Sequence, residues 1–150
     1  MDWSGGKDLT LEDTKKFLNQ IYDLDTDINS LIEEKASYLE LAEKITQNFD
    51  GERVQSSANH DKIADLTTKI VDTENEIIEK IDALYLKKTE ISKILLLLDD
   101  PKQRQILCLR HIRFNSFSEI SNKIGYEIRY TYKYYKKALN NFRNVLEDMK

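Results

Sequence analysis

Residues 116–126 have the sequence Ser-Phe-Ser-Glu-Ile-Ser-Asn-Lys-Ile-Gly-Tyr, and this stretch decides how the C-terminal part of the chain folds. Ser116, followed three residues later by Glu119, is typical of a capping box, in which each side chain satisfies a backbone N–H at the start of a helix. Gly125 is expected to end that short helix, because glycine adopts the left-handed conformation at low cost. A longer helix is expected from Glu127 to about Met149. The stretch therefore predicts two helices joined by a tight turn.

The longer helix has two faces that differ in chemistry. One face repeats apolar residues at spacings of three and four, and the cations follow the same spacing one position later. We assign Tyr134 and Tyr135 to packing. The residues expected to pack are Ile128, Thr131, Tyr135, Ala138, Phe142 and Val145. A row of cations along one helix face suits the phosphates of a nucleic acid. The residues on or beside this face, which are expected to contact DNA, are Arg129, Tyr130, Tyr132, Lys133, Lys136, Lys137, Asn140 and Arg143.

A third helix is predicted just upstream. Asp100-Pro101 is a helix-start signal, since an N-cap carboxylate precedes a proline at the first helical position. This helix is expected to run to about Arg113, with Cys108 as a small buried apolar residue. A short helix, a glycine turn and a longer cationic helix form the layout of a helix-turn-helix module, whose second helix enters the major groove of DNA.

The net charge of −4 is the average of two unlike halves. Residues 1–100 contain 12 Lys and Arg against 23 Asp and Glu, which gives −11, whereas residues 101–150 contain 11 against 4, which gives +7. Such asymmetry indicates a segment that faces a polyanion joined to one that faces another partner.

The acidic half has the pattern of a long helical hairpin. Apolar residues repeat at spacings of four and three from residue 11 to about residue 48, and again from residue 63 to residue 98. A polar turn separates the two runs, with Ser57 or Asn59 as N-cap of the second helix. The first stripe consists of Phe17, Ile21, Leu24, Ile28, Leu31, Tyr38, Ala42 and Ile45, widened by Leu18, Ile32 and Leu39. The second consists of Ile63, Leu66, Ile70, Ile77, Leu84, Ile91 and Leu98, with Thr73 and Ile81 filling gaps.

The first stripe is wider than one partner helix needs, so a third helix or a second chain is expected to cover it. We expect a homodimer, and a monomeric hairpin with a solvated acidic face remains an open alternative. The predicted fold is all-α: an N-terminal antiparallel hairpin of long helices, a coiled coil, followed by a C-terminal helix-turn-helix module. The expected segments are a flexible N-terminus (1–10), the hairpin (11–98) and the DNA-binding module (101–150).

Several classes of function are excluded by the sequence. Cys108 is the only cysteine, which excludes an internal disulfide framework and fits a reducing cytosol. The longest apolar run, from Ile94 to Leu98, is far shorter than a bilayer requires, and the N-terminus lacks the apolar core of a signal peptide, so a cytoplasmic protein is expected. The two histidines, His60 and His111, have no partner ligands nearby in sequence, so neither a metal site nor any other cofactor is expected. No phosphate-binding glycine loop or nucleophile motif is present, so an enzyme is not expected.

The run from Phe117 to Tyr126, continuing through Lys136-Lys137-Ala138-Leu139, resembles without gaps the helix-turn-helix of region four in bacterial sigma factors. The whole chain resembles a phage and prophage family of sigma-like transcriptional regulators, which also have a run like Glu52-Arg53-Val54-Gln55-Ser56-Ser57 before the second helix. The resemblance implies a role in phage late-gene transcription.

The resemblance also implies roles for individual residues. It places Arg129, Lys133, Lys136 and Lys137 where the family contacts DNA, and Thr131 and Tyr134 at buried helix positions. Two residues depart from the pattern: Glu127 stands where such modules usually have a Ser or Thr cap, and Ile128 where sigma factors often have arginine.

The sequence therefore predicts a DNA-binding transcriptional regulator in the cytoplasm of a bacterial host, an activator that recognises a promoter and acts there with RNA polymerase. Its partners would be double-stranded DNA, RNA polymerase and a second copy of the chain. Arg53 and Gln55 are candidates for contact with DNA or polymerase, although a loop that caps the second helix explains this segment equally well. Two other functions stay open: a small terminase-type DNA-packaging protein, and a structural coiled coil that never meets DNA.

Overall fold

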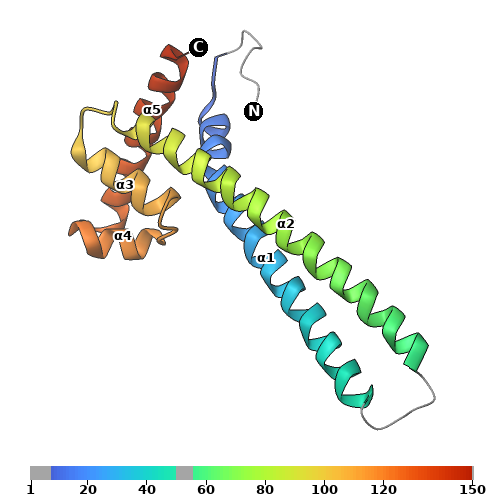
Figure 1. Ribbon diagram of the computed structural model, residues 1–150. Helices are drawn as coiled ribbons and strands as arrows, with labels where there is room; N and C mark the ends of the chain where they lie inside the picture. Colours follow the sequence, from blue (N-terminus) through green and yellow to red (C-terminus); the bar gives the residue numbers. More distant parts are fainter. Residues whose placement is uncertain (1–7, 50–55, 150) are drawn as a thin grey trace. The chain divides into compact units, whose positions relative to one another are not determined.

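The computed structural model describes residues 8–49 and 56–149. These residues form five α-helices and no strand, which confirms the predicted all-α fold of a hairpin followed by a helical module (Figure 1). Among the helices of these two segments, none contains an apolar stretch long enough to cross a membrane. The helices are α1 (Leu11–Phe49), α2 (Ser56–Leu95), α3 (Pro101–His111), α4 (Phe117–Ile124) and α5 (Ile128–Asp148).

The described residues divide into two compact units. One contains the residues up to Asp23 together with those from Leu84 onward, and the other is Leu24–Ala83. The first turns of α1 and the last turns of α2 therefore belong to the same unit as α3, α4 and α5. The boundary that the sequence suggested, between residues 98 and 101, falls inside this unit.

One apolar core joins these elements of the first unit. Phe17 on α1 and Ile91 on α2 are buried with Ile106, Ile120 and Phe142 from the three later helices. The rings of Phe17 and Phe142 lie 6.2 Å apart between centroids. Burial of large apolar side chains stabilises the fold by about 2 kcal/mol or more for each. The N-terminal end of the hairpin is therefore a structural part of the C-terminal module.

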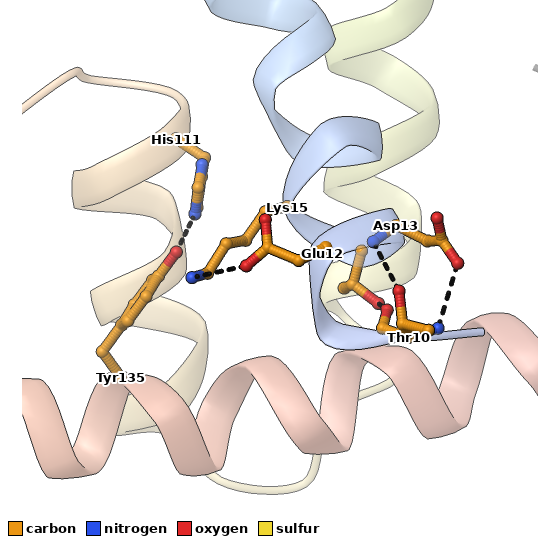
Figure 2. A network of polar contacts seen from close by, with 7 residues as sticks. Thr10, Glu12, Asp13, Lys15, His111 and Tyr135 are labelled. Atoms are coloured by element: carbon orange, nitrogen blue, oxygen red, sulfur yellow. Dashed lines mark hydrogen bonds and ion pairs between the residues drawn. The ribbon is translucent and has the colours of Figure 1, made fainter.

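Hydrogen bonds hold both the first turn of α1 and the residues just before it. Thr10 and Asp13 exchange hydrogen bonds between side chain and backbone, at 3.1 and 3.0 Å, as a capping box does (Figure 2). The backbone N–H of Leu9 donates to the Glu147 carboxylate at 2.9 Å, and the Leu9 side chain is buried. Residues 1–7 of the predicted flexible segment 1–10 lie outside the described residues. Leu9 differs from the prediction, because its side chain is buried and its backbone N–H is hydrogen-bonded.

In the second unit, α1 and α2 run antiparallel and pack through the predicted stripes. Ile28, Leu66 and Thr73 are buried between them. The prediction that Ile81 fills the α2 stripe is wrong, because its side chain is 48 % exposed. Lys80, one residue earlier and half-buried, occupies that position and forms an ion pair with Asp27 at 3.3 Å.

Two other local predictions are corrected. Helix α2 begins at Ser56, so Ser57 and Asn59 lie inside the helix and do not precede it as N-caps. The predicted contacts of Arg53 and Gln55 fall outside the described residues. Cys108 is half-buried rather than buried, since it lies at the edge of the core and not at its centre.

Candidate nucleic-acid interface

The turn between α4 and α5 forms as its sequence predicts. Ser116 and Glu119 exchange the two hydrogen bonds of a capping box, each 3.1 Å long, at the start of α4. Gly125 ends that helix with φ of +74°, in the left-handed region. The Ser121 hydroxyl donates to the carbonyl of Tyr126, which closes the turn. Glu127 stands at the N-cap of α5 and makes no capping bond with its side chain.

One face of α5 is embedded in the core of the first unit. The prediction that Ile128 belongs to this face is wrong, because its side chain is 47 % exposed. Ile128 is the first residue of α5, and the first buried residue of the helix is Thr131. The buried residues of α5 are Thr131, Tyr135, Ala138, Leu139, Phe142 and Leu146.

A buried polar contact joins α5 to α3. The His111 ring Nε2 lies 2.8 Å from the hydroxyl of Tyr135, and both side chains are buried (Figure 2). Burial lowers the pKa of His111 to about 3, with further lowering by the positive charges of Arg110 and Lys15. Burial also raises the pKa of Tyr135 to about 12. Both groups are therefore neutral at pH 7, and the contact costs no buried charge.

Two further contacts hold α5 against the start of α3. Asn141 donates to Gln103 at 2.8 Å, and the hydroxyl of Tyr134 donates to the Asp100 carboxylate at 2.5 Å. The Asp100 contact raises the pKa of Tyr134 to about 12. Asp100 also caps α3 by accepting from the backbone N–H of Lys102. Side chains thus fix the orientation of α5 at three points along its length.

The opposite face of α5 exposes its cations. Arg129, Lys133, Lys136 and Lys137 are all exposed. Within the described residues, none of these four forms an ion pair. A shallow depression of about 480 Å³ lies on this face, lined by Tyr130, Lys133, Tyr134, Lys136, Lys137 and Asn140.

The two tyrosines predicted to contact a ligand are about half exposed, at 55 % for Tyr130 and 50 % for Tyr132. Each is held by another ring: Tyr130 lies 5.3 Å from Tyr126, and Tyr132 lies 4.3 Å from Phe117, between ring centroids. Such packing limits the rotation of a tyrosine while leaving one edge accessible. Tyr135 is buried, as predicted, whereas Tyr134 is half-buried: it packs against the core and also lines the depression.

The remaining predicted residues are less accessible. Asn140 is half-buried and its amide donates to the carbonyl of Lys136 at 3.2 Å. Arg143 is also half-buried, and its Nε is buried with no hydrogen-bond partner among the described residues. The structure thus brings six of the eight predicted residues to the surface of one helix and leaves these two partly covered.

Sequence reasoning missed Lys102 as a neighbour of this face. Its Nζ donates to the hydroxyl of Tyr126 and lies 4.3 Å from the centroid of that ring. Lys102 is exposed at the start of α3. No periodicity links the two residues, because they are 24 positions apart, with Lys102 on α3 and Tyr126 in the turn between α4 and α5.

No protein-family model, curated protein or solved structure matches the chain.

Proposed function

We propose that the chain binds double-stranded DNA through α5 and regulates transcription. The observation that supports this most directly is the row of exposed cations on α5, which form no ion pair with any other described residue and lie opposite a face that is fixed in the core. An α-helix is about 10–12 Å across with its side chains, and the major groove of B-DNA is about 12 Å wide. Arg129 to Lys137 span roughly 12 Å of helix at 1.5 Å per residue, which suits one pass through the groove.

Residues at different positions along α5 have different roles in the proposed interface. Arg129, in the first turn, is the candidate for reading base edges, because the N-terminal residues of a recognition helix point into the groove. Lys133, Lys136 and Lys137 are candidates for phosphate contacts, which set affinity but carry little sequence information. Tyr130 and Tyr132 would contact the backbone or bases beside them.

Promoter recognition and action with RNA polymerase form the finer part of the proposal. They rest on the resemblance of residues 117–139 to region four of sigma factors. In this mechanism the protein brings or repositions polymerase and performs no chemical reaction. The acidity of the hairpin would weaken indiscriminate binding to DNA through repulsion of phosphates.

The proposal is tested by measuring the affinity for a labelled duplex as a function of salt. Each phosphate neutralised contributes about −0.9 to the slope of log K against log salt, so four to five contacts from one chain predict a slope of about −4. A flat response would overturn the proposal.

Substitutions locate the interface. Lys136→Ala should weaken binding to all duplexes about equally and reduce the slope by about 0.9. Lys44→Ala removes the same charge from an exposed position on α1 and serves as the matched control, which should leave the slope unchanged. Arg129→Ala should reduce the preference for a cognate duplex over a random one. Equal effects of Lys136→Ala and Lys44→Ala would exclude α5 as the interface.

A further inference from the structure

The unit Leu24–Ala83 exposes an apolar surface that its own two helices do not cover. Six large apolar side chains of this unit are about half exposed. One of the six, Leu41, is 48 % exposed and is set apart from the others. It lies on the same line along α1 as Asp27 and Glu34, at spacings of seven residues. The other five are Ile32 and Leu39 on α1, at 49 % each, and Val71, Ile78 and Ile81 on α2, at 48, 57 and 48 %.

An ion pair between α1 and α2 shows that these other five residues lie together. Lys35 on α1 and Glu74 on α2 are 2.9 Å apart. Ile32 and Leu39 are three residues before and four residues after Lys35. Residues three and four apart are neighbours on a helix surface, so both lie beside the ion pair.

The same relation holds on the other helix. Val71 and Ile78 are three residues before and four residues after Glu74, and Ile81 follows Ile78 by three. Aliphatic side chains from both helices therefore surround a neutral ion pair. We call these five residues the aliphatic face. It exposes roughly 400 Å², within the range of patches that are often functional on a monomer.

Charge distinguishes the aliphatic face from the rest of the unit. Residues 24–83 contain 15 Asp and Glu against 6 Lys and Arg, a net charge of −9. On the side that carries Leu41, Asp27 forms an ion pair with Lys80, and the ammonium of Lys69 lies 5.9 Å from the centroid of the Tyr38 ring. Among the described residues, the charges at the centre of the aliphatic face are those of Lys35 and Glu74, which cancel.

We propose that the aliphatic face is where a second copy of this chain binds, hairpin against hairpin. Within the described residues, the acid at the centre of this face, Glu74, is already paired with Lys35, so the centre does not favour a basic partner, whereas a second copy offers the same apolar side chains around the same neutral pair. Ile32 and Leu39 are seven residues apart, as are Val71 and Ile78, and this is the repeat of a helix–helix seam. A two-fold arrangement places the same patch against itself.

The available area is sufficient for a stable dimer. The part of α1 from Leu24 to Phe49 is about 39 Å long at 1.5 Å per residue. Two helices side by side are about 20 Å wide, so the whole side of the hairpin that carries the aliphatic face offers about 700–800 Å² per chain, with the aliphatic face at its centre. A stable interface of standard size buries about 800 Å² on each partner. The proposal concerns this unit alone and does not depend on DNA binding.

The test is the mass of the full-length protein in solution, measured by sedimentation equilibrium from about 1 to 100 μM. The wild-type chain should have twice the 17.7 kDa of one copy. Leu39→Glu and Ile78→Glu should each weaken the dimer at least tenfold, since a charge would be buried in the interface. Leu41→Glu is the matched control: it is the same substitution on the same helix, at a residue of nearly equal exposure, and the dimer should persist.

Three results would overturn the proposal: a wild-type monomer at 100 μM, an equal loss of dimer in Leu41→Glu, or a ring of eight or more subunits. Circular dichroism checks that each variant stays helical, and Leu39→Gln should weaken the dimer in the same direction without adding charge. The salt dependence of DNA binding is measured separately, so a failed dimer and a failed DNA interface give different results.

Discussion

The buried histidine of α3 makes the stability of the protein depend on pH in a calculable way. His111 is 6 % exposed, and burial, followed by the charges of Arg110 and Lys15, lowers its pKa from 6.5 to about 3. In the unfolded chain the ring has the ordinary pKa. Below pH 6.5 the unfolded state therefore binds a proton that the folded state does not bind. Stability is present in full above pH 6.5 and is lost as the pH falls toward 3.

The size of the loss follows from the two pKa values of His111. One pKa unit corresponds to 1.36 kcal/mol, and between pH 7.5 and 5.0 the unfolded ring becomes protonated while the folded ring stays neutral. The free energy of unfolding should fall by about 2 kcal/mol over this interval. This window lies above the range in which most carboxylates titrate.

The measurement is urea unfolding at pH 7.5, 6.5 and 5.0 for the wild type and for His111→Gln. Glutamine can still form a hydrogen bond with the Tyr135 hydroxyl but has no titratable proton, so the wild type should lose about 2 kcal/mol more than the variant. Tyr135→Phe is the control, because it removes the hydrogen bond and leaves His111 buried. That variant should keep the pH dependence.

An equal decrease in the free energy of unfolding between pH 7.5 and 5.0 in the wild type and in His111→Gln would refute this reasoning. It would mean that the folded protein accepts the proton on His111 without cost. Solvent would then reach the ring between α3 and α5, and the contact with Tyr135 would not fix α5 in the way the structure indicates.

Two further predictions concern the turn and the start of α3. Gly125→Ala should lower the free energy of unfolding by about 1 kcal/mol, because a residue with a Cβ is strained at φ of +74°. No atom lies within 4 Å of the added Cβ, so steric overlap adds nothing to this cost. Chemical denaturation measures this change, and an unchanged midpoint would contradict the assigned turn. Asp100→Asn should lower the pKa of Tyr134 from about 12 toward 10, since the hydrogen bond to the carboxylate is the main cause of the raised pKa. NMR titration of the tyrosine ring carbons measures it, and an unmoved pKa would exclude that contact.

Local signals explain why much of the fold is predictable from the sequence. Asp100-Pro101, the capping box at Ser116 and the glycine at position 125 each depend on residues within three positions of one another. The two long helices follow from periodicity that continues for more than thirty residues. The caps and the turn are stabilised within their own segments, and each long helix shows in its own sequence the apolar stripe that it buries against the other, so the sequence pattern is sufficient.

The shared core of the first unit was not predictable in the same way. Phe17 and Phe142 meet across 125 positions, and nothing in either local pattern names the other as its partner. The sequence also assigned Ile128 to the packed face because its spacing fits. Spacing gives the direction of a side chain, but not whether another element is present there to cover it.

The candidate interface shows a similar limit. Spacing predicted the exposed row on α5, including Lys133 and Lys136. It did not predict that Arg143, on the same row, would be half-buried with an unpaired Nε. Lys102 reaches Tyr126 from another helix, so only the fold brings it there.

The division of charge at residue 100 does not coincide with the boundary between the two units. The division at residue 100 assigns the N-terminal acids to a segment apart from α5, yet α1 up to Asp23 lies in the same unit as α5. Two of the acids in this part of α1 are engaged close by: Glu12 is paired with Lys15 at 3.4 Å, and Asp13 accepts from the backbone N–H of Thr10 (Figure 2). These contacts hold the first turn of α1, so Glu12 and Asp13 take part in starting that helix. The charge around α5 therefore has to be judged within the first unit, to which both these acids and the exposed cations of α5 belong, and not from the division of the sequence at residue 100.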